Sequence, residues 1–116
     1  MDSILQTIKE KLDIDPDSTD FDNELITDIN SVLFILNEIG VGISGYTISG
    51  PDETWAGFLG SDRKDVEAVK TYTALKVRLM FDVDSMTSGI IGAIENQIKE
   101  LEWRLYVLEN TEVNNE

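Results

Sequence analysis

The sequence predicts an all-α fold: a small bundle of three long helices plus a short N-terminal helix, with a glycine-rich loop between the second and third helices. Three observations support this prediction. Apolar residues recur every three or four positions, Ser, Thr or Asp residues precede the apolar runs, and six of the eight glycines fall within residues 40–61. A chain of 116 residues has room for one hydrophobic core, so we expect a single domain over 1–116.

The first predicted helix is short and is followed by an acidic loop. It covers about residues 3–12, and its apolar residues fall at helical spacing: Ile4, Leu5, Ile8 and Leu12. Residues 13–20 are rich in Asp and contain Pro16, a combination that is typical of a loop.

The second helix is expected over about 20–39, with Thr19 or Asp20 as its N-cap and Gly40 at its C-terminal end. Its apolar face is wider than one stripe, which predicts a central position in the bundle. The residues of this face are Leu25, Ile26, Ile29, Val32, Leu33, Phe34, Ile35, Leu36 and Ile39.

Residues 40–61 are expected to form the longest irregular segment, with a short helical stretch near 53–59. The third helix is expected over about 63–81, and Asp62 with Asp65 resembles a capping box at its start. Its apolar residues are Val66, Val69, Tyr72, Leu75, Val77, Leu79 and Met80.

The last helix is expected over about 87–109, with Ser85 or Thr87 as its N-cap. Its apolar stripe alternates steps of four and three, as in a helix that is packed along its whole length. The residues of the stripe are Ile94, Ile98, Leu101, Leu105 and Leu108. The polar residues 111–116 are expected to fray.

The composition argues against an enzyme, because the chain has no histidine and no cysteine. The commonest general base, the usual metal ligands and every catalytic triad built on imidazole are therefore missing. We expect no catalytic residues and no cofactor. No basic start leads into an apolar run, and no stretch approaches the ~18 apolar residues of a membrane span. We therefore expect a soluble protein of the cytoplasm.

The chain is strongly acidic, with a net charge of −14 that is unevenly distributed. Residues 1–62 hold 13 acids and two bases, whereas residues 63–116 hold 10 acids and seven bases. Such a surface repels phosphate groups, so nucleic-acid binding is not expected.

Residues 40–45 match the dinucleotide-binding pattern G-x-G-x-x-G. That pattern needs a preceding strand and a following helix, because the helix N-terminus holds the pyrophosphate. Here it follows a predicted helix and precedes residues that do not begin one. We therefore predict no nucleotide site.

The acidic loop resembles an EF-hand, with Asp13, Asp15, Asp17 and Glu24 at the first, third, fifth and twelfth ligand positions. Ser18 stands where the loop needs glycine, and Pro16 stiffens the fourth position. The residues favour a solvated acidic linker over a Ca²⁺ site. A small acidic Ca²⁺-binding or regulatory helical module remains the alternative function, which calorimetry with Ca²⁺ would test.

Two aromatic pairs are candidates for a protein–protein surface. Trp103 and Tyr106 lie three residues apart, outside the apolar stripe of the last helix. Trp55 and Phe58 lie in the glycine-rich region. For each pair the other interpretation is a place in the core: a wide buried helix face for the first, and a loop pinned onto the core for the second.

The order of several segments resembles the head–tail connector, or head-completion adaptor, family of long-tailed bacteriophages. The segments that carry the resemblance are the short first helix, the Asp-rich linker, Asp28-Ile29-Asn30-Ser31 with Asn37, Gly40-Val41-Gly42, Trp55 with Phe58-Leu59-Gly60, Val69-Lys70-Thr71-Tyr72 through Phe81-Asp82, and Leu101-Glu102-Trp103-Arg104-Leu105. The family often has prolines after its Phe-Asp pair, whereas this chain has Val83-Asp84.

The resemblance implies a structural virion protein of a phage or prophage, located at the virion neck and in the host cytoplasm before assembly. It implies a homo-oligomeric ring of about a dozen subunits, a closed symmetric assembly that binds the portal protein on one side and a tail-side completion protein on the other. DNA would pass through the ring without specific binding.

Overall fold

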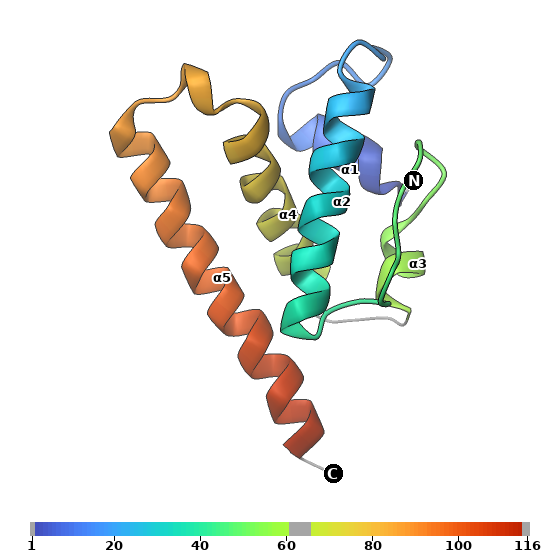
Figure 1. Ribbon diagram of the computed structural model, residues 1–116, viewed down its shortest axis with the longest axis vertical. Helices are drawn as coiled ribbons and strands as arrows, with labels where there is room; N and C mark the ends of the chain where they lie inside the picture. The colour runs from blue at the N-terminus through green and yellow to red at the C-terminus, as the bar shows by residue number, and fades with distance from the viewer. Residues whose placement is uncertain (1, 61–65, 115–116) are drawn as a thin grey trace.

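The computed structural model describes residues 2–60 and 66–114, with side chains described up to residue 107 (Figure 1). The elements are α1 (Ile4–Lys11), α2 (Asp22–Ile39), α3 (Trp55–Leu59), α4 (Val66–Phe81), the 3-10 turn η1 (Val83–Ser85) and α5 (Ser88–Asn114). The described residues contain no strand, only one isolated bridge between Ser3 and Thr54. The predicted all-α fold is confirmed.

The helix α2 is the centre of the bundle, as its wide apolar face predicted. It packs against α4 and also contacts α1 and α5. The chain reverses direction between α2 and α4 and again between α4 and α5, so that α2 and α5 run in the same direction (Figure 1). The C-terminal part of α5 extends beyond the end of the other helices (Figure 1).

The start of α2 differs from the prediction, because its N-cap is Phe21 and no side chain caps it. Thr19 and Asp20, the predicted caps, lie in the turn before the helix. The cause is the ammonium group of the buried Lys9, which lies 2.7 Å from the Ser18 carbonyl oxygen and 2.7 Å from a carboxylate oxygen of Asp22. This contact with α1 holds residues 18–22 in the conformation that places the first helical residue at Asp22.

Other predicted helix ends are confirmed. Gly40 ends α2 in the left-handed conformation, with φ 103°, which glycine adopts without a Cβ clash. Thr87 precedes α5, and its hydroxyl accepts a hydrogen bond of 3.2 Å from the Ile90 amide. The short helical stretch expected near 53–59 is α3.

The last helix is longer than predicted, since α5 continues to Asn114 instead of ending near 109. No glycine or proline interrupts the chain from residue 109 to residue 114, and the fraying expected for residues 111–116 stays a prediction. The predicted capping box of Asp62 and Asp65 and the first residues of the third helix lie outside the described residues.

The hydrophobic core lies where α1, α2, α3 and α4 meet, and α5 contributes one stripe to it. Ile94, Ile98 and Leu105 of this stripe are buried and Leu101 is half-buried, while the side chain of Leu108 lies outside the described residues. Phe34 and Met80 were expected to make core contacts, but both are exposed. The buried apolar residues of the first four helices and the loop are Ile4, Leu5, Ile8, Leu25, Ile29, Val32, Leu33, Leu36, Val41, Ile48, Trp55, Phe58, Val69, Tyr72, Ala74 and Val77.

None of the helices in the described part of the chain is both long enough and apolar enough to cross a membrane.

Candidate interaction surfaces

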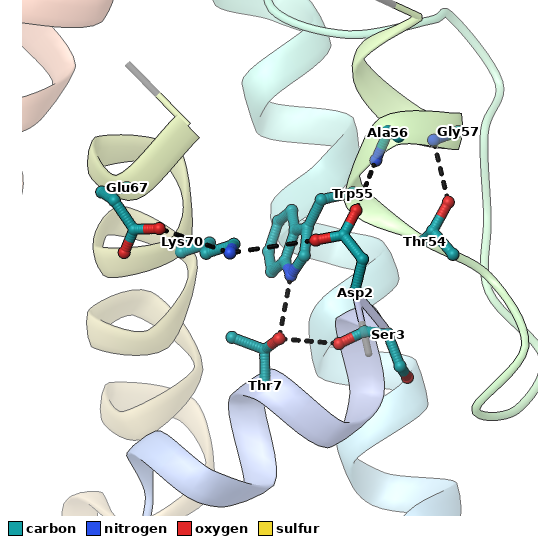
Figure 2. Close-up of polar contacts among 9 residues, drawn as sticks. All are labelled: Asp2, Ser3, Thr7, Thr54, Trp55, Ala56, Gly57, Glu67 and Lys70. Atoms are coloured by element: carbon teal, nitrogen blue, oxygen red, sulfur yellow. Dashed lines mark hydrogen bonds and ion pairs between the residues drawn. The ribbon is translucent and has the colours of Figure 1, made fainter. Parts of the chain in front are cut away.

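Trp55, one of the four candidate interface residues, lies in the core with 0% of its surface exposed. Its indole N–H donates a hydrogen bond of 3.1 Å to the Thr7 hydroxyl, which itself donates one of 2.7 Å to the Ser3 carbonyl (Figure 2). The backbone holds the same region, because Trp55 N–H donates to Asp2 and Ile4 N–H donates to Glu53. The N-terminal residues thus fasten α3 to α1.

The carboxylate of Asp2 extends this junction to α4. One of its oxygens accepts a 3.1 Å hydrogen bond from the Ala56 amide at the start of α3. The other lies 3.9 Å from the ammonium group of Lys70, which also pairs with Glu67 at 3.4 Å (Figure 2). The three helices α1, α3 and α4 therefore meet around one buried indole ring.

Phe58, the neighbour of Trp55 in the second candidate pair, is also fully buried. Its ring packs against Tyr46 and directly under Gly42, where an added Cβ would lie 2.3 Å from the Phe58 ring. The interface hypothesis for Trp55 and Phe58 is therefore wrong for this structure. The alternative interpretation, a loop pinned onto the core, is the observed one.

Two asparagines of α2 hold the glycine-rich loop. The Asn30 amide donates to the Ile48 carbonyl at 3.0 Å and accepts from the Ile48 amide at 2.7 Å, so the side chain binds the backbone as a strand neighbour would. Asn37 donates to the Val41 carbonyl at 2.9 Å. The G-x-G-x-x-G residues lie in this loop after α2, and the next helix begins only at Trp55. The nucleotide-site context is therefore missing.

Hydrogen bonds within the acidic loop, between its side chains and its backbone, hold its conformation. Asp15 accepts a hydrogen bond of 2.9 Å from the Asp17 amide, and Asp13 adopts a left-handed conformation with φ 61°. Glu24, the predicted closing ligand, lies in the first turn of α2. Within residues 2–60 and 66–114, no three acidic side chains are grouped so that they could hold a metal ion.

Two acidic side chains, Asp28 in α2 and Glu53 in the loop before α3, have shifted pKa values. Partial burial and the nearby negative charge of Glu24 raise the pKa of Asp28 above its usual value. Desolvation opposes ionisation of Glu53, but hydrogen bonds from Ser49 and Gly50 outweigh it and lower the pKa of Glu53. Neither group lies in an apolar pocket of the kind that an acid–base catalyst needs.

The remaining candidate pair is on the surface, since Trp103 is 67% exposed and Tyr106 is 51% exposed. Both side chains line an open groove between α2 and α5 with a volume of about 450 Å³. We call this the aromatic groove, and its lining residues are Ile35, Glu38, Ile39, Lys99, Glu102, Trp103 and Tyr106. Only part of this site was predicted, because Ile35 and Ile39 were assigned to the apolar face of α2.

Phe34 enlarges this apolar surface and was missed by sequence reasoning. Its side chain is 65% exposed on α2 and lines a shallow depression that shares Ile35 with the aromatic groove. A signal was present, because Phe34 lies outside the stripe of Ile29, Leu33 and Leu36 that faces the core. The surface from Phe34 across Ile35 to Trp103 is continuous.

Tyr72 of α4 is joined by a hydrogen bond to a lining residue of the aromatic groove. Its hydroxyl donates a hydrogen bond of 2.7 Å to the carboxylate of Glu102, a residue of the groove. Burial, this hydrogen bond and the charge of Glu102 raise the pKa of Tyr72 well above its usual value. A buried residue of α4 thus holds the helix that carries the aromatic pair.

Of the comparisons with known proteins, the one with protein families gives a match. No curated protein and no solved structure matches the chain significantly. A protein-family model described as phage connector protein matches residues 4–112, which include every helix described above except the last two residues of α5. The chain therefore belongs to the phage connector protein family.

Proposed function

We propose that this chain is the subunit of a ring-shaped adaptor that joins the portal of the DNA-filled head to the tail. Membership of the phage connector family gives it a structural role at the junction between head and tail, in the neck of the virion. In the proposed ring, the subunit binds further copies of itself, the portal protein and a tail-side completion protein.

The observation that carries this proposal is the aromatic groove. Trp103 and Tyr106 expose large apolar rings on a helix that extends beyond the bundle (Figure 1). Exposed aromatic residues beside a groove are typical of protein–protein interfaces, where they supply much of the binding energy.

The charge of the chain supports the same proposal. A net charge of −14 opposes contact between copies, so assembly must rest on apolar contacts such as those of the aromatic groove. An acidic ring would also offer no attractive site to the phosphates of DNA that passes through it. The ring would then guide DNA without retaining it.

The direct test is co-purification with a phage portal protein, followed by electron microscopy. We expect the connector to bind the portal and to form rings, either alone at high concentration or only on the portal. A connector that neither binds the portal nor forms a closed oligomer would rule the proposal out. The alternative Ca²⁺ module has no support in the described geometry and is not proposed further.

A further inference from the structure

The large apolar side chains that are exposed among the described residues lie at two ends of the bundle. Because α2 and α5 run in the same direction and α4 runs in the opposite one, the end of α2 and the start of α5 are far apart (Figure 1). The first group lies towards the end of α2: Phe34, Ile43, Trp103 and Tyr106. The second group lies towards the start of α5: Phe21, Met80, Val83 and Ile90.

Within the second group, Ile90 differs from the others in its surroundings. Phe21, Met80 and Val83 each have an acidic residue within two positions in the sequence. Ile90 is 51% exposed at the centre of residues 85–94, which contain no charged residue at all. We call residues 85–94 the uncharged segment. In a chain with 23 acidic residues, it is a segment that contributes no carboxylate of its own to a contact with another copy.

The backbone of the uncharged segment is also open to close approach. A Cβ atom added at Gly92 would have no neighbour within 4 Å, and one at Gly89 would meet only the Thr87 hydroxyl at 4.0 Å. The glycines therefore leave space on the helix surface next to Ile90. An aromatic side chain of a neighbouring copy can therefore pack against α5 here without displacing a side chain.

The start of α5 and the end of α2 are among the described helix ends that lack the charges favoured by the helix dipole. The first turn of α5 has no acidic residue, although the first turn of α2 has two. The last turn of α2 has no basic residue and holds Glu38, an acid at the negative end of a helix. A carboxylate is stabilised at a helix N-terminus and destabilised at a C-terminus. Glu38, which lines the aromatic groove, is therefore complementary to the start of α5.

We propose that the uncharged segment of one copy docks in the aromatic groove of the next copy, with Ile90 against Trp103 and Tyr106. The carboxylate of Glu38 then faces the N-terminus of the neighbour's α5, so that contact between two acidic chains places opposite partial charges together. This inference rests on the proposed ring and names the two surfaces that build it.

The spacing of the two surfaces allows one copy to bind two neighbours. Ile90 and Trp103 are 13 residues apart on α5, which corresponds to about 20 Å along the helix. Each copy thus presents its uncharged segment to one neighbour and its groove to the other. Such head-to-tail contacts use different surfaces on the two partners, and they form a ring when the rotation from one copy to the next closes.

Cysteine cross-linking tests the contact, and the chain has no cysteine of its own. Ser88 lies in the uncharged segment and Lys99 lies on the rim of the groove, and both are exposed. The double variant Ser88→Cys/Lys99→Cys, treated with a short bis-maleimide after assembly, should give a ladder of oligomers. The matched control Ser88→Cys/Thr71→Cys places the second thiol in the groove between α4 and α5, and it should give little cross-linking.

A charged residue introduced at position 90 tests the same contact in a monomer that should remain folded. Ile90→Asp adds an acid to the first turn of α5, where the helix dipole favours it, so the monomer should remain folded. It also places a carboxylate beside Glu38 of the neighbour, and self-association should weaken by at least about tenfold. Glu38→Lys in the same chain should restore much of the loss.

The outcomes separate this inference from the proposed function. Rings that form on the portal but show no cross-link between positions 88 and 99, and that tolerate Ile90→Asp, would overturn the assignment of surfaces and leave the ring intact. A chain that stays monomeric at high concentration and with the portal protein present would overturn both. A cross-linked ladder that disappears in Ile90→Asp supports both.

Discussion

The Tyr72 hydroxyl lies 2.7 Å from the Glu102 carboxylate and joins the core of α4 to the exposed half of α5. A hydrogen bond to a charged acceptor contributes more than one between neutral groups. Here one residue is fully buried and the other lines the aromatic groove. The hydrophobic core and the aromatic groove are therefore linked through this pair.

Tyr72→Phe should lower the free energy of unfolding by about 1–2 kcal/mol, because Glu102 loses its donor but is partly exposed and can be hydrated. Urea denaturation measures the change. Tyr46→Phe is the matched control, since the Tyr46 hydroxyl lies 3.5 Å from its acceptor on Thr54 and should contribute little. Equal losses in both variants would contradict a specific role for the Tyr72–Glu102 bond.

The same pair predicts a loss of stability at alkaline pH. The folded chain keeps Tyr72 protonated at pH values where the unfolded chain ionises, because its pKa is raised in the folded state. The stabilisation is therefore complete below about pH 10, the ordinary tyrosine pKa, and is lost as the pH rises above it. The decrease above pH 10, measured by urea denaturation, should be smaller in Tyr72→Phe than in the parent chain.

Gly42→Ala should destabilise the protein by about 3 kcal/mol or more. Gly42 has φ 85°, and an added Cβ would lie 2.3 Å from the ring of the buried Phe58, so backbone strain and overpacking add together. Gly45 has a similar φ of 81° but nothing within 4 Å. Gly45→Ala should therefore cost only about 1 kcal/mol. Thermal denaturation that ranks the two variants in the opposite order would contradict this account.

Features that depend on local chemistry could be predicted from the sequence. Gly40 ends α2 because glycine readily adopts the left-handed backbone conformation that this position needs. Thr87 caps α5 by accepting a hydrogen bond from an amide only three residues away. The start of α2 could not be predicted in this way, because Lys9 in another helix determines where Asp22 lies. The prediction failed where a contact distant in sequence outweighed a good local cap.

The candidate site shows the same division. Neither Trp55 nor Trp103 belongs to a helical stripe of apolar residues in the sequence. Their neighbours in the sequence do not reveal that Trp55 is buried and Trp103 is exposed. The difference comes from the N-terminal residues, which close over Trp55 through Asp2 and Thr7, whereas Trp103 is largely exposed. An isolated aromatic residue in the sequence therefore predicts neither role.

Lys9→Met should destabilise the protein by about 2–3 kcal/mol. The substitution leaves the Asp22 carboxylate without its ion pair, and removal of one partner from a buried pair is costly, although partial exposure of Asp22 reduces the cost. Lys11→Met, at an exposed site in the same helix, should change stability by less than about 0.5 kcal/mol. Adding Asp22→Asn to Lys9→Met should recover part of the loss, as measured by urea denaturation.

The two tryptophans give the sharpest contrast between folding and assembly. Trp55→Ala removes a fully buried ring and its hydrogen bond to Thr7, and it should cost about 3–5 kcal/mol, enough to unfold a small domain. Trp103→Ala removes a ring that is 67% exposed, so thermal stability should stay within about 1 kcal/mol of the parent chain. The same Trp103 variant should weaken ring formation or portal binding, measured by co-purification and electron microscopy. If Trp103→Ala unfolds the isolated subunit, Trp103 belongs to the core, and the surface around Phe34 becomes the remaining apolar candidate for the interface.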